Sequence, residues 1–259
     1  MSPTVTGLGQ AGVRLAWPGL TIYVDPYLTD YVADRYGEAL RRLIPPPFAA
    51  HQITDADWVL VTHAHEDHAD PTSLGPLSAA SPQARFVCPR SVVTILLDAG
   101  IARSRIVLAP LHWLPLAHDV AIRAVPAAHL AIERDESGAP SCVGYLMRAG
   151  ERVVYHSGDT IPHPDVIAAV REEGPIASAF LPVNERNYYR EAQGIIGNMS
   201  VREAVQFARD IQAGELIPIH WDLFGPNSTP KPEIRLIHEL MGGTPAIRFC
   251  ESGLTEVLW

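Results

Sequence analysis

Residues 61–68 of this 259-residue chain read Val61-Thr62-His63-Ala64-His65-Glu66-Asp67-His68. Residues 58–62, which overlap the start of this stretch, form an apolar run typical of a buried strand. The residues that follow offer Asp70 as a helix N-cap and Pro71 at the first helical position. The histidine-rich stretch is therefore predicted on a strand-to-helix loop. His63 and His65 are two residues apart and can point the same way, while Asp67 and His68 turn to a second point, so one loop can hold two metals.

The density of this cluster argues for metal binding. A lone histidine is usually a surface residue or a satisfied core residue, but clustered imidazoles repel one another when protonated unless a cation binds. The spacing is not the helical His-Glu-x-x-His of zinc proteases, because Glu66 follows His65 but has no histidine three residues after it. We therefore predict that His63, His65, Asp67 and His68 are metal ligands.

Composition and charge restrict the class of protein. The chain is 47% hydrophobic and 19% charged, as in a globular protein. It has no linker or low-complexity tract, and we predict one domain over residues 1–259. The net charge of −9 disfavours a nucleic-acid partner. No apolar run approaches the roughly 20 residues of a membrane span. The N-terminus resembles no signal peptide and the three cysteines are scattered, so we expect a cytoplasmic protein with reduced thiols and no membrane partner.

The order of predicted elements is typical of an α/β protein. Gly7, Gly9 and Gly12 have dinucleotide-fingerprint spacing, but a second strand follows them, which favours a tight hairpin. The long, proline-rich connection over residues 28–52 is expected to form a wall or lid over the site, with a plain surface excursion as the alternative. Further strands are predicted at 21–24, 85–88, 105–108, 120–125, 142–148, 152–155, 177–183, 215–219 and 246–250. Helices are predicted at 91–99, 164–173, 200–212 and 231–240.

Three more candidate ligands lie where strands end. His129, Asp159 and His220 each follow a β-rich run, as His63 does. Strand ends at one edge of a sheet converge in space, which is where α/β folds place their sites. The combined set of five histidines and two aspartates suits two divalent ions about 3.5–4 Å apart, with a shared carboxylate and a bridging water.

This motif set resembles the metallo-β-lactamase superfamily over nearly the whole chain. The resemblance implies an α/β (α+β) fold, a four-layer αββα sandwich. It implies that one metal is held by His63, His65 and His129, and the other by Asp67, His68 and His220. Asp159, within Ser157-Gly158-Asp159-Thr160, would bridge the two. Asp25, after an early strand, would orient a ligand histidine from behind, and His156 would also support the ligands.

The C-terminal half is similar to the L-ascorbate-6-phosphate lactonase group. The similarity lies in residues 155–159, 184–186, 197–200 and 217–224. The chain fits a broader branch of that group, because His129 stands near where the ascorbate-phosphate lactonases carry an acidic residue. The exact substrate is therefore open.

The predicted centre implies hydrolysis by a metal-activated water, with Asp67 aligning that water or moving its proton. The nitrogen and oxygen ligands admit Zn, Mn or Fe, and the resemblance favours Zn or Mn. A hydrolase of a small lactone or ester is the favoured function. A phosphodiesterase or ribonuclease of the same fold and a non-hydrolytic metal-binding protein are the alternatives. The acidic balance and the single lysine, Lys231, disfavour a nuclease.

The predicted substrate is a small anionic, sugar-derived molecule. The loop over residues 184–197 carries Arg186 and Arg190, and an arginine fork can hold a phosphate or carboxylate. Arg186 as a solvated surface charge is the alternative. The predicted substrate contacts are Tyr27, Asn184, Arg186, Asn198 and Trp221. The remaining histidines, at 51, 112, 118, 163 and 238, are expected to be surface or packing residues. Association with further copies of the chain is left open.

Overall fold

The first half of the chain builds most of one seven-stranded sheet. The computed structural model describes residues 2–117 and 119–259. The strand order is β14-β1-β2-β3-β4-β5-β6. Strands β1 to β3 are antiparallel, and β3 to β6 are parallel. The bounds are β1 Thr4–Gly9, β2 Gly12–Trp17, β3 Leu20–Val24, β4 Trp58–Leu60, β5 Arg85–Cys88, β6 Ile106–Leu108 and β14 Thr255–Val257.

The second half repeats this plan in a second seven-stranded sheet, ordered β13-β12-β11-β10-β9-β8-β7. Strands β7 to β10 are antiparallel, and β10 to β13 are parallel. The bounds are β7 Leu114–Ala117, β8 Val120–Pro126, β9 Val143–Ala149, β10 Arg152–His156, β11 Ser178–Pro182, β12 Glu215–Ile219 and β13 Ala246–Ile247.

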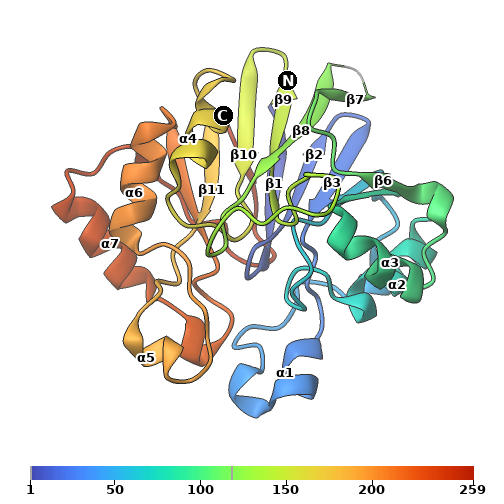
Figure 1. Cartoon of the computed structure of the whole chain (residues 1–259), viewed down its shortest axis with the longest axis horizontal. Coiled ribbons are helices and arrows are strands. Elements are labelled where there is room, and N and C mark those ends of the chain that lie inside the picture. The colour runs from blue at the N-terminus through green and yellow to red at the C-terminus, as the bar shows by residue number, and fades with distance from the viewer. Residues whose placement is uncertain (1, 118) are drawn as a thin grey trace.

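Helices cover the outer face of each sheet (Figure 1). Helices α2 (Pro71–Ala80) and α3 (Val93–Asp98) pack on the first sheet, and α4 (Pro164–Arg171), α6 (Val201–Asp210) and α7 (Lys231–Leu240) pack on the second. Alternate apolar residues of both sheets, among them Leu15 and Met147, meet between them in a common core. The predicted four-layer αββα sandwich is confirmed.

Strand direction places the functional loops together. Strands β1, β3 and β4 run the same way in the first sheet, as do β8, β10, β11 and β12 in the second. Their carboxyl ends meet at one edge of the sandwich. Two short helices, α1 (Tyr31–Tyr36) and α5 (Tyr188–Glu191), project below that edge on either side (Figure 1).

Helix starts follow the predicted capping chemistry. The Asp70 side chain accepts from the backbone N–H of Thr72 at 2.8 Å, and Pro71 is the first helical residue of α2. Ser200 and Glu203 form a reciprocal capping box at the start of α6. These local bonds fix where each helix leaves the loop before it.

Several elements differ from the sequence prediction. Strand β7 was missed because Pro115 lies in it, and proline is tolerated there because β7 is an edge strand. Strand β14, exposed and only three residues long, was also missed. The strand predicted at 246–250 is shorter, and α5 interrupts the loop predicted over residues 184–197.

The connection over residues 28–52 is not a plain loop. It contains α1 and two 3₁₀ turns, η1 (Glu38–Leu40) and η2 (Ala50–Gln52). Two further turns, η3 (Arg90–Val92) and η4 (Arg103–Arg105), flank α3, and η5 (Gly225–Asn227) follows β12. Within the described residues, no helix has both the length and the apolar character needed to cross a bilayer. His118 lies outside the described residues.

Candidate metal centre

All seven predicted ligands converge at the edge where the strands end. They form two groups, and within each group the candidate ligand atoms lie within 4.8 Å of one another. The first group is His63, His65, His129 and Asp159, and the second is Asp67, His68 and His220. This division matches the division implied by the resemblance. His63 Nε2 lies 3.0 Å from His65 Nδ1, so these two imidazoles point to a common place.

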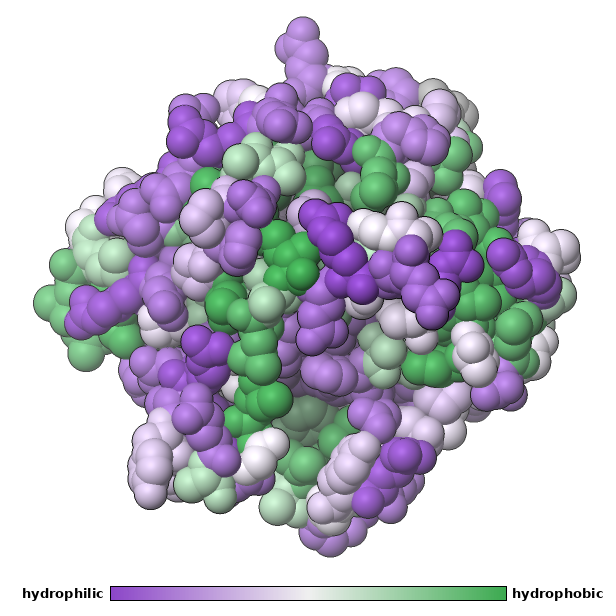
Figure 2. All heavy atoms as spheres, viewed as in Figure 1, coloured by the Kyte–Doolittle hydropathy of each residue, from purple (hydrophilic) through white to green (hydrophobic). Residues whose placement is uncertain are grey.

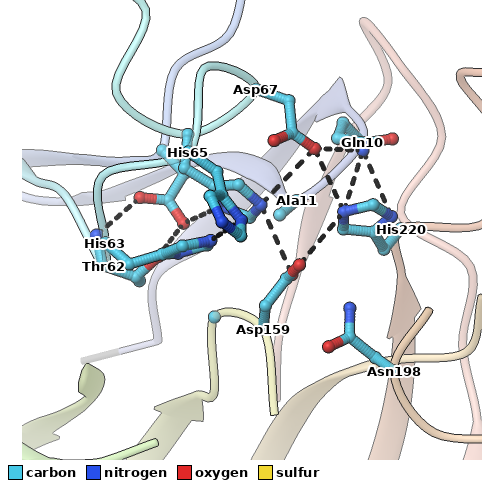
Figure 3. A network of polar contacts seen from close by, with 12 residues as sticks. Gln10, Ala11, Thr62, His63, His65, Asp67, Asp159, Asn198 and His220 are labelled. Carbon is cyan, nitrogen blue, oxygen red and sulfur yellow. Dashed lines mark hydrogen bonds and ion pairs between the residues drawn. The ribbon is translucent and has the colours of Figure 1, made fainter. Parts of the chain in front are cut away.

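Asp159 faces both groups (Figure 3). Its Oδ2 lies 3.5 Å from His129 Nε2 and 3.4 Å from His220 Nε2. Its Oδ1 lies 3.3 Å from His68 Nε2. One carboxylate therefore touches ligands from the first group and from the second, as a bridging position requires.

A glycine allows Asp159 to reach this place. Gly158 has a φ of +58°, and a Cβ atom built on it would lie 2.7 Å from the Cβ of Thr62. The loop after β10 thus presses against the residue that precedes His63, and a side chain at position 158 would push the two ligand loops apart.

The donor set fits divalent cations. His68 Nε2, His129 Nε2 and Asp159 Oδ1 are buried and lack a hydrogen-bond partner. Buried polar atoms are rarely left so, and here three of them point into the same small volume. Imidazole nitrogens and carboxylate oxygens are the donors that Zn, Mn and Fe accept in proteins. These seven residues would hold the ions that the fold implies.

Charges within the site are strongly coupled. Burial, together with the neighbouring His68, holds the pKa of His63 well below its usual range. For His220, burial is outweighed by Asp159 and Asp67, which raise its pKa to about 9. His220 and Asp159 therefore stabilise each other as an ion pair in the metal-free protein, and a metal ion must displace the proton of His220 in order to bind it.

Asp25 and His156 support the ligand loops from behind. The Nδ1–H of His68 donates to Asp25 Oδ2 at 2.8 Å, which leaves His68 Nε2 facing the site. His156 Nε2–H donates to the carbonyl of Ala11 at 2.8 Å, and its Nδ1 accepts from the backbone N–H of Gly158 at 3.2 Å. Both residues are fully buried, and each holds a ligand or a ligand-bearing loop.

The two groups form the floor of a pocket of about 230 Å³. The walls come from the two projecting segments that carry α1 and α5 and from the loop after β12. They consist of Val32, Leu40, Gly194, Ile195, Ile196, Phe224 and Asn227. Figure 2 shows the hollow between the projections that bear α1 and α5, with hydrophobic side chains on its walls. Among the described residues, neither an arginine nor a lysine lines it.

Comparison with known proteins agrees with this geometry. A family model described as the beta-lactamase superfamily domain matches residues 21–221. The chain belongs to the metallo-β-lactamase superfamily. An uncharacterized protein of Mycobacterium tuberculosis is 25% identical over 238 residues, covering 90% of this chain but 63% of the relative. This superfamily member therefore spans less than two thirds of the mycobacterial relative that it matches.

Other relatives of this superfamily member carry the names of hydrolases, two of which are named as metal enzymes. A UPF0173 metal-dependent hydrolase of Pyrococcus horikoshii is 28% identical, with 83% of each chain covered. The probable L-ascorbate-6-phosphate lactonase UlaG of Escherichia coli is 25% identical, covering 75% of this chain and 56% of the relative. The structure of Igni18, a metallo hydrolase of Ignicoccus hospitalis, has a TM-score of 0.72 at 20% identity and covers 99% of this chain and 98% of its own. The names of these relatives agree with the prediction of a metal-dependent hydrolase of the metallo-β-lactamase fold.

Among the described residues, the predicted substrate contacts are not part of the lining of the metal pocket in this superfamily member. Tyr27 is fully buried, and its hydroxyl accepts from the backbone N–H of Val32. Trp221 lines a separate cavity of about 840 Å³ with the proline run at 45–47. Arg186 is exposed, its Nε lies 4.0 Å from Glu191, and it does not line the metal pocket. None of these three residues lines the metal pocket, and their contact with a substrate stays a prediction.

Two predicted asparagine contacts are structural links. Asn198 and Asn184 are buried, and the amide of Asn198 donates to Asn184 at 3.1 Å. Asn184 in turn donates to Asn227, which does line the pocket. Arg190 is also buried, and it donates to the carbonyls of Glu185 and Ser228. These side chains hold the pocket wall in place and do not line the pocket themselves.

One residue of the site was missed from the sequence. Gln10, in the turn between β1 and β2, lies beside Asp67 and His220 (Figure 3). The rule that found the ligands also applies to it, because Gln10 is a polar residue directly after a strand whose carboxyl end lies at this edge. From the sequence, the glycines at 7, 9 and 12 were sufficient to account for the turn, so no function was predicted for Gln10.

Proposed function

We propose that this protein is a dinuclear metal-dependent hydrolase of a small ester or lactone that carries an apolar group beside its scissile carbonyl. The proposal rests on one observation. Two groups of ligands that share Asp159 form the floor of a pocket whose walls are mostly apolar. A carbonyl compound held on that floor would place its side group against Val32, Ile195 and Phe224.

The residues of the pocket have distinct tasks in such a reaction. Two divalent ions bound here, zinc or manganese, would polarise the carbonyl oxygen and make a water nucleophilic near neutral pH. Asp67 lines the pocket with a carboxylate that is 17% exposed. It can accept the proton of the attacking water and return it to the leaving oxygen. The apolar walls exclude bulk water from the carbonyl.

The lining does not favour the anionic, sugar-derived substrate expected from the sequence. A phosphate or carboxylate at the walls would lose its hydration without gaining a cationic side chain. A neutral substrate loses less on entering. The same absence of basic lining residues argues against a phosphodiesterase or ribonuclease, which would need contacts for its backbone phosphates.

The test is a matched substrate panel. Metal-free protein would be reloaded with zinc or manganese, its metal content measured, and its hydrolysis of neutral acyl lactones, phosphorylated sugar lactones and phosphodiesters compared. We expect close to two ions per chain and hydrolysis of the neutral lactones. Protein that binds two ions but cleaves only phosphodiesters or phosphorylated lactones would refute the proposed substrate.

Variants of two aspartates complete the test. Asp159→Asn removes a charge that both ions would share, so metal content and turnover should fall together. Asp98→Asn, on the exposed end of α3, is the matched control and should keep both. Full metal content and full turnover in Asp159→Asn would rule out the bridge.

A further inference from the structure

Gln10 lies in the metal site, but the proposed reaction gives it no task. It follows β1 directly, so it lies at the edge where the ligand-bearing strands end. It is 4% exposed although its side chain is polar. Its φ of +58° lies in the left-handed region, which is unfavourable for residues other than glycine, asparagine and aspartate.

The contacts of Gln10 all reach the second ligand group or its neighbour. Its Nε2 donates to Asp67 Oδ2 at 2.6 Å and lies 2.9 Å and 3.1 Å from the two ring nitrogens of His220. Its backbone carbonyl accepts from the N–H of His220 at 2.8 Å. Its own N–H donates to Asp222 Oδ1 at 3.0 Å. One turn residue therefore contacts two candidate ligands that different sheets supply.

Backbone conformation sets this edge apart from the rest of the chain. Among the described residues, four non-glycine residues have positive φ: Gln10, Asp25, His220 and Gln212. The first three belong to the site or support it, and unfavourable backbone of this kind persists where surrounding contacts impose it. The hairpin itself needs only the backbone of Gln10, since glycine or asparagine would form the same turn. The direction of the amide is therefore independent of the turn.

We propose that Gln10 is a positioning residue for the second metal ion. Its amide holds the carboxylate of Asp67, and its carbonyl holds the backbone of His220, so the spacing of these two ligands is set before an ion arrives. Hydrogen bonds of this kind to metal-ligating carboxylates control metal affinity in other proteins. This role rests on the proposed two-metal function, and it goes beyond it by assigning control of one ion to one side chain.

The informative variant is Gln10→Asn. Asparagine tolerates the left-handed backbone and keeps both main-chain bonds, but its amide is one methylene too short to hold Asp67 in the same way. Gln206→Asn is the matched control, because Gln206 donates to Asp210 on the exposed face of α6. Cobalt(II) serves as the probe. Metal-free protein is titrated with cobalt(II) in the presence of a competing chelator, and the absorption of the protein-bound ions measures their affinity.

Two backgrounds separate the two ions. His65→Ala removes a ligand of the first group only, and His220→Ala removes one of the second. In the first background Gln10→Asn should weaken binding of the remaining cobalt ion about 10- to 100-fold. In the second background, and in Gln206→Asn, cobalt affinity should stay the same.

The outcomes are distinguishable. If the wild-type protein does not bind two cobalt ions, the proposed two-metal function fails, and the role of Gln10 with it. If the wild type binds two and Gln10→Asn weakens both ions equally, or neither, only the positioning role is overturned. A lower melting temperature of metal-free Gln10→Asn with unchanged cobalt affinity would also overturn it, because Gln10 would then be purely structural.

Discussion

Asp25→Asn perturbs a buried carboxylate whose oxygens are both occupied. Asp25 is 0% exposed. Its Oδ1 accepts from the backbone N–H of Thr62 at 2.8 Å. Its Oδ2 accepts from Thr62 Oγ1 at 2.7 Å and from His68 Nδ1 at 2.8 Å. An asparagine supplies one acceptor oxygen where the native side chain supplies two, so one of these sides must meet an NH₂ group.

The consequence for His68 depends on which side is lost. If the new amide oxygen keeps the Thr62 N–H, its NH₂ group faces His68 Nδ1, which must then accept a hydrogen bond. The neutral imidazole would carry its proton on Nε2, the atom that faces the site, and Nε2 could no longer bind a metal. If the oxygen turns to His68 instead, two N–H donors oppose each other at Thr62.

The magnitude follows from the bond that is lost. Losing a charge-assisted hydrogen bond costs about 1.5–3 kcal/mol of stability. Hydrogen bonds behind metal ligands change metal affinity about 10- to 100-fold, which corresponds to roughly 1.4–2.8 kcal/mol. We therefore expect Asp25→Asn to lower the free energy of unfolding and, separately, the affinity for the second ion. Chemical denaturation and competition with a chelator measure the two.

Asp70→Asn is the matched control. Asp70 is as buried as Asp25 and accepts from Thr29 and from Thr72, but it touches no candidate ligand. It should lose comparable stability and keep its metal affinity. If both variants lose metal affinity equally, or if Asp25→Asn keeps it, Asp25 does not orient His68 for metal binding.

Three further predictions follow from the site. Gly158→Ala should cost about 1–3 kcal/mol of stability and reduce metal content, because its Cβ meets Thr62; Gly174→Ala, also at positive φ but with no atom within 4 Å, should keep its metal content. Metal affinity at the second group should fall at least tenfold for each pH unit below 9, because His220, with its pKa raised to about 9, is protonated there and must lose that proton, and the carboxylates around His68 raise its pKa as well; chelator competition between pH 6 and 9 measures this, and a flat profile would contradict it. Arg186→Ala should leave kcat/KM within about twofold on neutral and anionic lactones alike, since its one ion pair is exposed; a loss confined to anionic substrates would restore Arg186 as an anion anchor.

The convergence of the candidate ligands was predictable because their positions obey a rule of chain direction. His129, Asp159 and His220 are far apart in sequence, but each follows a strand whose carboxyl end lies at the same edge. A polar residue at such a point is visible in one sequence. The resemblance added the assignment of ligands to two groups. Gln10 obeys the same rule and was missed because the glycines around it gave the turn a sufficient explanation.

The pocket walls were not predictable, because no periodic pattern determines where they lie. Val32 and Leu40 come from the segment after β3, and Ile195 and Ile196 come from the loop after α5. Neither segment shows the regular alternation from which a buried face can be predicted. Their positions depend instead on single long-range contacts, which a sequence without a structure does not reveal.

Two arginines illustrate how single long-range contacts position the wall segments. The Arg42 guanidinium donates to the carbonyls of Tyr27, at 2.7 Å, and Leu8, at 3.1 Å. Arg190 does the same for Glu185 and Ser228, both at 2.6 Å. Each arginine thus fastens a wall segment to the main chain around the site by bonds to carbonyl oxygens. Arg190 seemed from the sequence to be available for an anionic substrate, but its donors are used within the protein. The positions of the walls depend on these arginine hydrogen bonds, whereas the positions of the candidate ligands depend on the ends of the strands. Substitutions in the wall segments can therefore change substrate preference while the metal centre keeps its geometry.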